Sequence, residues 1–260
     1  MNQKHDYIAV FDSGVGGISV LRHLLRHLPG ERFLYFGDSA NAPYGSRSTE
    51  EVRQLTLAAA KKLTTEYPVK ALVIACNTAT AAAVQQVRQC YPNLVVIGIE
   101  PALKVAADRF PKGNIGVMAT SVPLREEKFQ HQTERFPDAR IYPIPAPGLV
   151  EKIEGGLLKD KQTYELLEKL LLPYQGRLDA LVLGCTHYPF AAALIGDILG
   201  PETVMLDGGA GTARQTKRCL EAAGLLNEGR GSITIESSCS DGKLRELAKK
   251  LLEADAANVI

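Results

Sequence analysis

The chain has 260 residues, of which 45% are hydrophobic and 23% are charged, and this composition is typical of globular proteins. Its 30 basic and 29 acidic residues leave a formal net charge of +1, which gives no electrostatic basis for binding nucleic acid. Five cysteines, an odd number, argue against a secreted disulfide framework. Residues 1–11 lack the long apolar core of a signal peptide, and no apolar stretch approaches the ~20 residues of a membrane span. We therefore expect a cytoplasmic, reduced protein that does not bind a membrane.

Short apolar strands alternate with helices in the first part of the chain. Apolar runs predict strands at residues 7–11, 32–36, 69–75 and 94–99. Helical spacing predicts helices at residues 18–27, 49–67 and 78–89, and Thr49 is expected to cap the second of them. Strands that alternate with helices indicate a parallel sheet with helices on both faces.

The strand pattern then restarts, which indicates an internal repeat. Residues 114–120 resemble residues 7–13, and Val117 follows Val10 by 107 residues. The segment Ala-Leu-Val-Leu-Gly-Cys185 resembles Ala-Leu-Val-Ile-Ala-Cys76, at a spacing of 109 residues. Two pairs at nearly the same spacing predict a duplication with pseudo-two-fold symmetry. The helices and strand at residues 210–253 are expected to complete the first domain. The predicted domains are therefore residues 1–98 with 208–260, and residues 99–207.

Polar side chains and cysteines follow the predicted strands, where open parallel sheets bind their ligands. The residues at or just past a strand end are Asp12, Ser13, Asp38, Cys76, Glu100, Thr120, Cys185 and Asp207. The expected fold class is α/β: two pseudo-symmetric, doubly wound parallel-sheet domains with the active site in the cleft between them.

Cys76 and Cys185 are the main candidates for chemistry. Each follows an apolar strand and precedes a polar pair, Asn77-Thr78 or Thr186-His187. We expect each pair to open a helix, whose N-terminus favours a thiolate. No second cysteine stands at zinc-ligand spacing and the histidines are dispersed, so no metal site is expected.

A matched pair of thiols suits racemisation without a cofactor. One thiolate removes the α-proton, and the other thiol protonates the opposite face of the planar carbanion. An unperturbed thiol has a pKa of about 8.5, which an enzyme can tune toward neutrality. The same layout also allows an amino-acid-binding protein or a redox switch.

Several neighbours of the thiols are candidates for supporting roles. Asp12 and Ser13 precede a glycine-rich turn whose backbone N–H groups can approach a carboxylate. Asp12 could orient a substrate ammonium, hold the proton of Cys76, or only cap the next helix. His187 is expected to relay a proton, and Glu151 is either a second acid or a solvated helix residue.

The loop from Asp38 to Gly45 is the last candidate segment. Pro43 and Gly45 fix its path, and the hydroxyl of Tyr44 can bond a carboxylate. The same composition also suits an ordinary surface turn.

These stretches together resemble the glutamate racemases of the aspartate/glutamate racemase superfamily, which make D-glutamate for bacterial cell walls without a cofactor. The stretches that carry the resemblance are Phe11–Gly17, Gly37-Asp38, Asn41–Gly45, Ala75–Thr80, Glu100-Pro101 and Gly184–Pro189. Weaker matches are Ile115–Val117, Ala119-Thr120 and Leu149–Glu151. The chain departs from the family pattern at Val122-Pro123, where the family has a second threonine, and at Ala146, where it often has cysteine.

The resemblance implies the role of each site residue. Cys76 and Cys185 would be the acid/base pair, with Asp12 assisting the first thiol, and His187 and Glu151 assisting the second. Glutamate would be bound by Asp12, Ser13, Pro43, Tyr44, Gly45, Asn77, Thr78, Thr120, Thr186 and His187. The resemblance also implies a homodimer that needs neither cofactor nor metal. An aspartate racemase or a related isomerase of the same superfamily is the alternative, because the sequence does not show the depth of the pocket that separates glutamate from aspartate.

Overall fold

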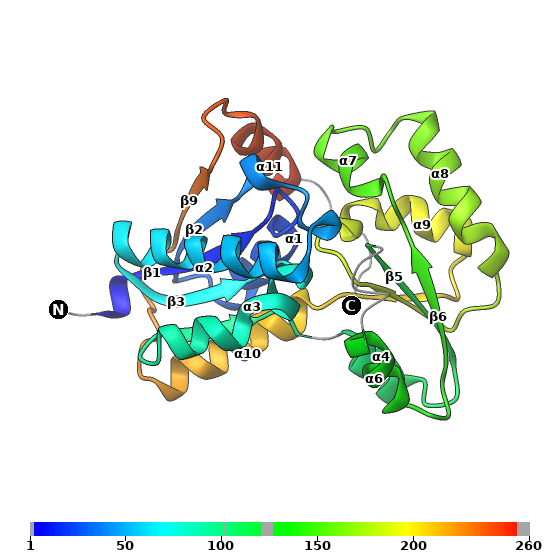
Figure 1. The fold of residues 1–260 in the computed structure, drawn as a ribbon, viewed down its shortest axis with the longest axis horizontal. Helices are drawn as coiled ribbons and strands as arrows, with labels where there is room; N and C mark the ends of the chain where they lie inside the picture. Colours follow the sequence, from blue (N-terminus) through cyan, green and yellow to red (C-terminus); the bar gives the residue numbers. More distant parts are fainter. Residues whose placement is uncertain (1–2, 101, 121–126, 254–260) are drawn as a thin grey trace. The chain divides into compact units, whose positions relative to one another are not determined.

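The computed structural model describes residues 3–100, 102–120 and 127–253. Within these ranges the chain divides into two compact units, residues 3–100 with 209–253 and residues 102–120 with 127–208. Each unit contains a parallel sheet and its helices (Figure 1), so the α/β class predicted from the sequence is confirmed. Pro101 and the Val122-Pro123 departure from the family pattern lie outside the described residues.

The first unit is built on a five-stranded sheet in the order β4-β3-β1-β2-β9, in which all neighbours are parallel. Its strands are β1 (Tyr7–Asp12), β2 (Arg32–Gly37), β3 (Val69–Ile74), β4 (Val95–Gly98) and β9 (Ser232–Ser237). Its α-helices are α1 (Ile18–His27), α2 (Thr49–Glu66), α3 (Asn77–Cys90), α10 (Gly209–Ala222) and α11 (Lys243–Glu253).

Both faces of this sheet are buried. Successive side chains of a strand point to opposite faces, and Ala9 and Phe11 of β1 share an apolar cluster with residues of α2 and α3. Ile8 and Val10, on the opposite face of β1, are also fully buried. Helix α1 packs against α10 and α11. Strands buried on both faces explain the continuous apolar runs in the sequence.

Helix α2 begins with a capping box. The Ser48 hydroxyl accepts a hydrogen bond from the Glu51 backbone N–H, and the Glu51 carboxylate accepts one from the Ser48 N–H. The cap is therefore Ser48 and not Thr49, as the sequence had led us to expect. A capping box needs two reciprocal hydrogen bonds between the N-cap and the residue three positions later, and Ser48 and Glu51 have this spacing.

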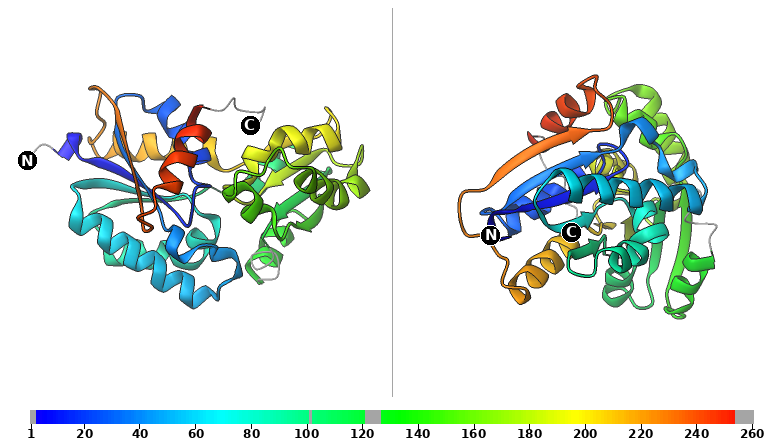
Figure 2. Two further views of the ribbon diagram at one scale, coloured as in Figure 1. Left: turned by 90° about the horizontal axis from the view of Figure 1, so that it is seen from above. Right: turned by 60° about the vertical axis from the view of Figure 1, so that its left-hand side comes forward.

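The carboxy-terminal segment returns to the first unit. Strand β9 pairs with β2 from Arg32↔Ser232 to Gly37↔Ser237, and Figure 2 shows it beside β2 at the sheet edge with α11 next to it. A fully buried ion pair holds the start of this return: Lys70 Nζ lies 2.6 Å from Glu31 Oε2. Lys70 also donates to the Leu225 carbonyl at 2.9 Å, and Asn227 N–H donates to Glu31 at 2.8 Å.

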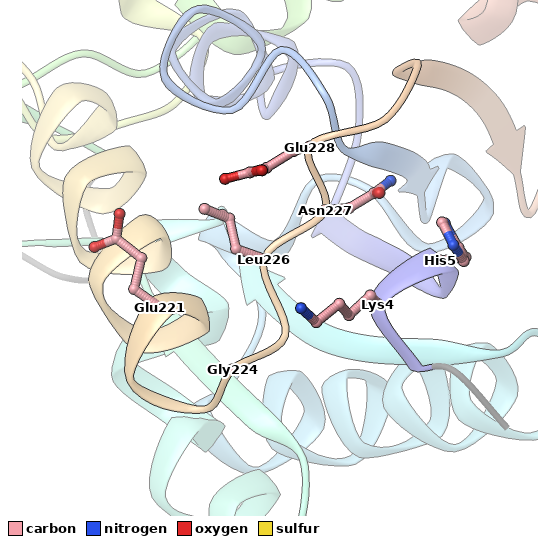
Figure 3. A pocket seen from close by; sticks show the side chains of 7 residues that line it. All are labelled: Lys4, His5, Glu221, Gly224, Leu226, Asn227 and Glu228. Carbon is pink, nitrogen blue, oxygen red and sulfur yellow. The ribbon is translucent and has the colours of Figure 1, made fainter.

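A pocket of about 410 Å³ opens beside this return segment (Figure 3). It is lined by Lys4, His5, Glu221, Gly224, Leu226, Asn227 and Glu228. These residues precede β1, or lie in the last turn of α10 and the segment after it, so the pocket lies at the amino-terminal edge of the sheet. None of them is a candidate site residue.

The second unit is a four-stranded parallel sheet in the order β6-β5-β7-β8. Its strands are β5 (Asn114–Ala119), β6 (Arg140–Pro145), β7 (Ala180–Leu183) and β8 (Val204–Leu206). Its α-helices are α4 (Ala102–Arg109), α6 (Glu127–Glu134), α7 (Leu149–Glu154), α8 (Lys161–Leu171) and α9 (Ala192–Leu199). Within the described ranges, no helix is both long and apolar enough to cross a membrane.

The two units share one strand order. The first four strands of the first unit are arranged β4-β3-β1-β2, and those of the second are arranged β8-β7-β5-β6. Strand β9 is an addition that only the first sheet carries. This correspondence supports the internal repeat predicted from the sequence. It also matches β3, which precedes Cys76, to β7, which precedes Cys185.

Candidate active site

In the first unit, three neighbouring strands bring Asp12, Asp38 and Cys76 to one edge of the sheet. The Asp38 backbone N–H donates to the Asp12 carbonyl at 2.9 Å. Ala75 N–H, one residue before Cys76, donates to the Phe11 carbonyl at 2.8 Å. All three side chains belong to buried residues. The carboxyl ends of these strands therefore gather two carboxylates and a thiol, as expected for a parallel sheet.

Cys76 is the N-cap of α3. Its Sγ accepts a hydrogen bond from the Ala79 N–H at 3.5 Å, and donates to Ser13 Oγ at 3.7 Å. Asn77 and Thr78 form the first turn of the helix and are half-buried. The sequence predicted this helix start, and the partial positive charge of a helix N-terminus favours a thiolate there.

The turn after β1 packs closely on Asp12. Gly14 N–H donates to Asp12 Oδ1 at 3.0 Å. A Cβ at Gly17 would lie 2.7 Å from the Asp12 Cβ, which is too close for any side chain. Glycine at position 17 is therefore needed for the turn to fold back over this carboxylate.

The loop from Asp38 to Gly45 is held by side-chain bonds. The Tyr44 hydroxyl donates to Asp38 Oδ2 at 2.6 Å, and Tyr44 is almost completely buried. Burial raises the pKa of Tyr44 far above its usual value, and the hydrogen bond to Asp38 and the negative charges of Asp38, Cys76 and Asp12 raise it further. The sequence predicts that this hydroxyl can bond a carboxylate, and in the structure that carboxylate belongs to Asp38.

Pro43 and Gly45 flank Tyr44 and are half-buried. The short 3₁₀ turn η3 (Tyr44–Ser46) contacts α3. The loop therefore reaches the helix that Cys76 caps, and the first unit gathers the predicted residues Asp12, Ser13, Pro43, Tyr44, Gly45, Cys76, Asn77 and Thr78.

In the second unit, Cys185 begins a chain of three side chains. Cys185 follows β7 and is half-buried. Its Sγ lies 3.6 Å from Nδ1 of His187. The other ring nitrogen, Nε2, lies 2.7 Å from Oε1 of Glu154. His187 is only 3% exposed, so thiol, imidazole and carboxylate form a connected path in which the imidazole is shielded from bulk water.

Glu154, and not Glu151, reaches His187. Both lie on α7, three residues apart and hence about one turn from each other. Glu151 is exposed, and its negative charge acts on the Tyr188 hydroxyl. Burial raises the pKa of Tyr188, and the charges of Cys185 and Glu151 raise it further. The sequence analysis singles out only Glu151; Glu154 lies three residues further on, and the placement of α7 brings Glu154 to the imidazole.

Thr186 and His187 do not open an α-helix, in contrast to our expectation. The segment after Cys185 forms the 3₁₀ turn η5 (Tyr188–Ala191), and α9 begins only at Ala192. In the first unit, Thr80 N–H donates to the Cys76 carbonyl at 2.9 Å and closes the first helical turn. The equivalent fourth residue after Cys185 is Pro189, which has no N–H to donate. Tyr188 N–H bonds the Cys185 carbonyl instead, at 3.1 Å.

Two further predicted residues lie in the second unit. Thr186 is buried beside Cys185 in the chain. Thr120 directly follows β5, the strand that pairs with β7. Gly184 N–H donates to the Met118 carbonyl at 2.7 Å, so Thr120 and Cys185 end adjacent strands.

The fold and these motifs agree with comparisons to known proteins. A family profile described as Asp/Glu/Hydantoin racemase matches residues 10–216. Glutamate racemase from Clostridium botulinum strain Alaska E43 is 45% identical over 258 residues, which cover 98% of this chain and 100% of that protein. Glutamate racemase isoform RacE1 from Bacillus anthracis has a TM-score of 0.86 at 31% identity, covering 99% of this chain and 97% of that one.

A third similar protein was solved with an amino acid bound. Escherichia coli glutamate racemase, in complex with L-glutamate and the activator UDP-MurNAc-Ala, has a TM-score of 0.85 at 26% identity, covering 98% of this chain and 97% of that one. The resemblance to glutamate racemases that the sequence motifs indicated is confirmed. The chain therefore belongs to the Asp/Glu/Hydantoin racemase family, and within it to the glutamate racemases, which are isomerases.

Proposed function

We propose that this chain interconverts L-glutamate and D-glutamate with Cys76 and Cys185 as paired acid/base groups and no cofactor. The observation that carries the proposal is the matched placement of the two thiols. Each follows the strand that pairs with the first strand of its unit, β3 with β1 and β7 with β5. The proposal requires both units to present their thiols to one substrate molecule.

The chemistry needs one proton removed and one returned. In one direction the Cys76 thiolate takes the α-proton, and the electron pair of the broken C–H bond is delocalised into the adjacent carboxyl group. The Cys185 thiol then protonates the opposite face of the planar carbanion and becomes a thiolate. The reverse reaction exchanges the two roles, so each thiol must be stable in both protonation states.

Each thiol has its own support for these two states. The N-terminus of α3 and the Ser13 hydroxyl stabilise charge on Cys76, and we propose that Asp12 assists this thiol from the adjacent strand end. His187 can exchange a proton with Cys185 across 3.6 Å. Glu154, at 2.7 Å from the other ring nitrogen, orients the imidazole and stabilises its charged form.

Glutamate is the substrate that the relatives favour, since the similar Escherichia coli enzyme was solved with L-glutamate bound. We propose that its charged groups are bound by polar side chains at the strand ends, namely Asp12, Ser13, Asn77, Thr78, Thr120, Thr186 and His187, and by backbone groups of the loop residues Pro43, Tyr44 and Gly45. We further propose that a cytoplasmic homodimer supplies the product, D-glutamate, to peptidoglycan synthesis.

Loss of optical activity tests the proposal. Wild-type protein should racemise L-glutamate, and the decrease in the circular dichroism signal measures the rate. Cys76→Ser and Cys185→Ser should each lose about 10²- to 10⁴-fold in rate, which is the usual contribution of a positioned acid/base group. Cys90→Ser is the matched control, because Cys90 is an exposed thiol at the last turn of α3. Activity that survives the loss of either Cys76 or Cys185 would refute the two-thiol mechanism.

A further inference from the structure

Asp38 is a buried carboxylate that the proposed proton transfers do not use. It follows β2 and is 5% exposed. Its two oxygens accept hydrogen bonds from Asn41 Nδ2 at 3.0 and 3.1 Å, and Oδ2 also accepts from the Tyr44 hydroxyl at 2.6 Å. Among the residues that the structure describes, no cationic side chain forms an ion pair with Asp38.

Burial of the Asp38 carboxylate lowers the stability of the folded protein unless its hydrogen bonds are strong. A buried carboxylate loses its hydration and needs compensating donors. The 2.6 Å distance from Tyr44 to Asp38 falls in the range of charge-assisted O–H···O⁻ bonds, which are about twice as strong as neutral ones. Asp38 therefore holds two side chains of the loop, those of Asn41 and Tyr44, by strong hydrogen bonds.

Asp38 fixes the loop at two points, Asn41 and Tyr44. Asn41 is bound through its amide, and its carbonyl accepts a bond from Arg47 Nε at 2.8 Å. The centroid of the Tyr44 ring lies 6.2 Å from that of the Phe11 ring, and Tyr44 belongs to the same apolar cluster as Cys76. The hydroxyl of Tyr44 has a single proton, so it cannot donate to a substrate carboxylate while it is bonded to Asp38.

We propose that Asp38 is a positioning residue for the racemisation: by binding the hydroxyl of Tyr44 and the amide of Asn41, it holds the loop of residues 38–45 in place beside the Cys76 thiol. Tyr44 then contributes the position of the loop and not a hydroxyl donated to the substrate. This inference rests on the proposed racemase function, and concerns how tightly glutamate is bound more than how fast its proton moves.

A double-mutant cycle separates this role from direct substrate contact. Asp38→Ala and Tyr44→Phe should each raise KM about tenfold, the size expected for loss of one bond to a charged group. The double variant should be no worse than about twofold beyond the poorer single variant, because both changes break the same bond. Asp38→Asn should be milder than Asp38→Ala, since an asparagine oxygen can still accept from Tyr44.

Two readouts distinguish positioning from a general loss of structure. In the single variants kcat and the primary isotope effect with α-deuterated glutamate should stay close to wild type, while KM rises. Ser46→Ala, directly after the loop, is the control: it removes an exposed hydrogen bond to the Pro43 carbonyl at 3.3 Å without touching Asp38, and should leave KM close to wild type. Losses that multiply in the double variant of Asp38→Ala and Tyr44→Phe, or KM values within about twofold of wild type for both single variants, would overturn the inference.

Calorimetric titration with L-glutamate keeps this test separate from the racemase proposal. If wild-type protein binds glutamate but does not racemise it, the proposed function fails, and the dissociation constants of the same variants still report on Asp38. If wild type racemises glutamate and the variants bind it as wild type does, only the role of Asp38 fails.

Discussion

The two thiols end equivalent strands of two similar sheets, yet their surroundings differ. Cys76 is buried, caps an α-helix and contacts a hydroxyl. Cys185 is half-buried, precedes a 3₁₀ turn and lies beside an imidazole bound to a carboxylate. One residue explains much of the difference: the fourth position after the thiol is Thr80 in one unit and Pro189 in the other. A repeated scaffold thus places two thiols alike and supports them by different chemistry.

The addition of β9 to the first sheet is a second difference between the units, and removing its anchor should have the largest effect on stability. Lys70→Met leaves Glu31 buried without its partner, which should cost about 3–5 kcal/mol of unfolding free energy. Urea unfolding measures this loss. Lys62→Met is the control: it breaks the exposed pair with Glu66, which is worth about 0–1 kcal/mol. Similar losses in the two variants would show that the buried pair does not hold the return segment.

Removing the imidazole should disable only the second thiol. We expect His187→Asn to lower kcat/KM about 100-fold, since the proton relay on Cys185 is lost. Because the equilibrium constant between enantiomers is 1, kcat/KM must fall equally in both directions. The asymmetry should appear instead in the isotope effect, which should rise for the enantiomer that Cys185 deprotonates. Equal isotope effects in both directions would contradict a role confined to Cys185.

The two glutamates of α7 give a matched test of the same path. Glu154→Gln should lower kcat/KM about tenfold, because an amide orients the imidazole but does not stabilise its charge. Glu151→Gln should stay within about threefold of wild type, because Glu151 is exposed and does not reach His187. The reverse order in a steady-state assay would assign the supporting role to Glu151.

Tyr44 and Tyr188 are buried tyrosines whose pKa values are raised in part by the thiols of their own units, and here we expect the smallest effect. The raised pKa values of Tyr44 and Tyr188 keep both phenols protonated in the folded protein above the usual value of 10.0. Their contribution to stability is complete below pH ~10 and is lost as the pH rises further, since unfolded tyrosine then ionises. Absorbance titration at 295 nm should show the same native signal below pH ~10.5 in wild type, Tyr44→Phe and Tyr188→Phe. A smaller signal in either variant would show that its tyrosine ionises normally.

The sequence predicted the parts of the site that depend on strand ends. Apolar runs located β1, β3, β5 and β7, and parallel pairing then placed Asp12 next to Cys76 and Thr120 next to Cys185. The helix after Cys76 was predicted from its composition. Its absence after Cys185 could have been read from Pro189, because the missing N–H removes the bond that closes the first turn.

Contacts that depend on packing were not accessible from the sequence. Spacing alone puts Glu151 and Glu154 on one short helix, and the position of α7 relative to His187 decides which of them bonds the ring. The partner of Tyr44 depends in the same way on the path of the loop, because Tyr44 and Asp38 are six residues apart in the chain. Both are side-chain contacts between segments whose distance is set by the folded core.

The incorporation of solvent deuterium tests the paired thiols most directly. In heavy water, L-glutamate is incubated with wild-type enzyme and sampled early, and the Cα–H of each enantiomer is measured by mass spectrometry after chiral separation. Two bases on opposite faces predict that newly formed D-glutamate carries deuterium while the remaining L-glutamate keeps its proton. D-glutamate that retains the original proton would mean that one group removes and returns it, and would contradict the account.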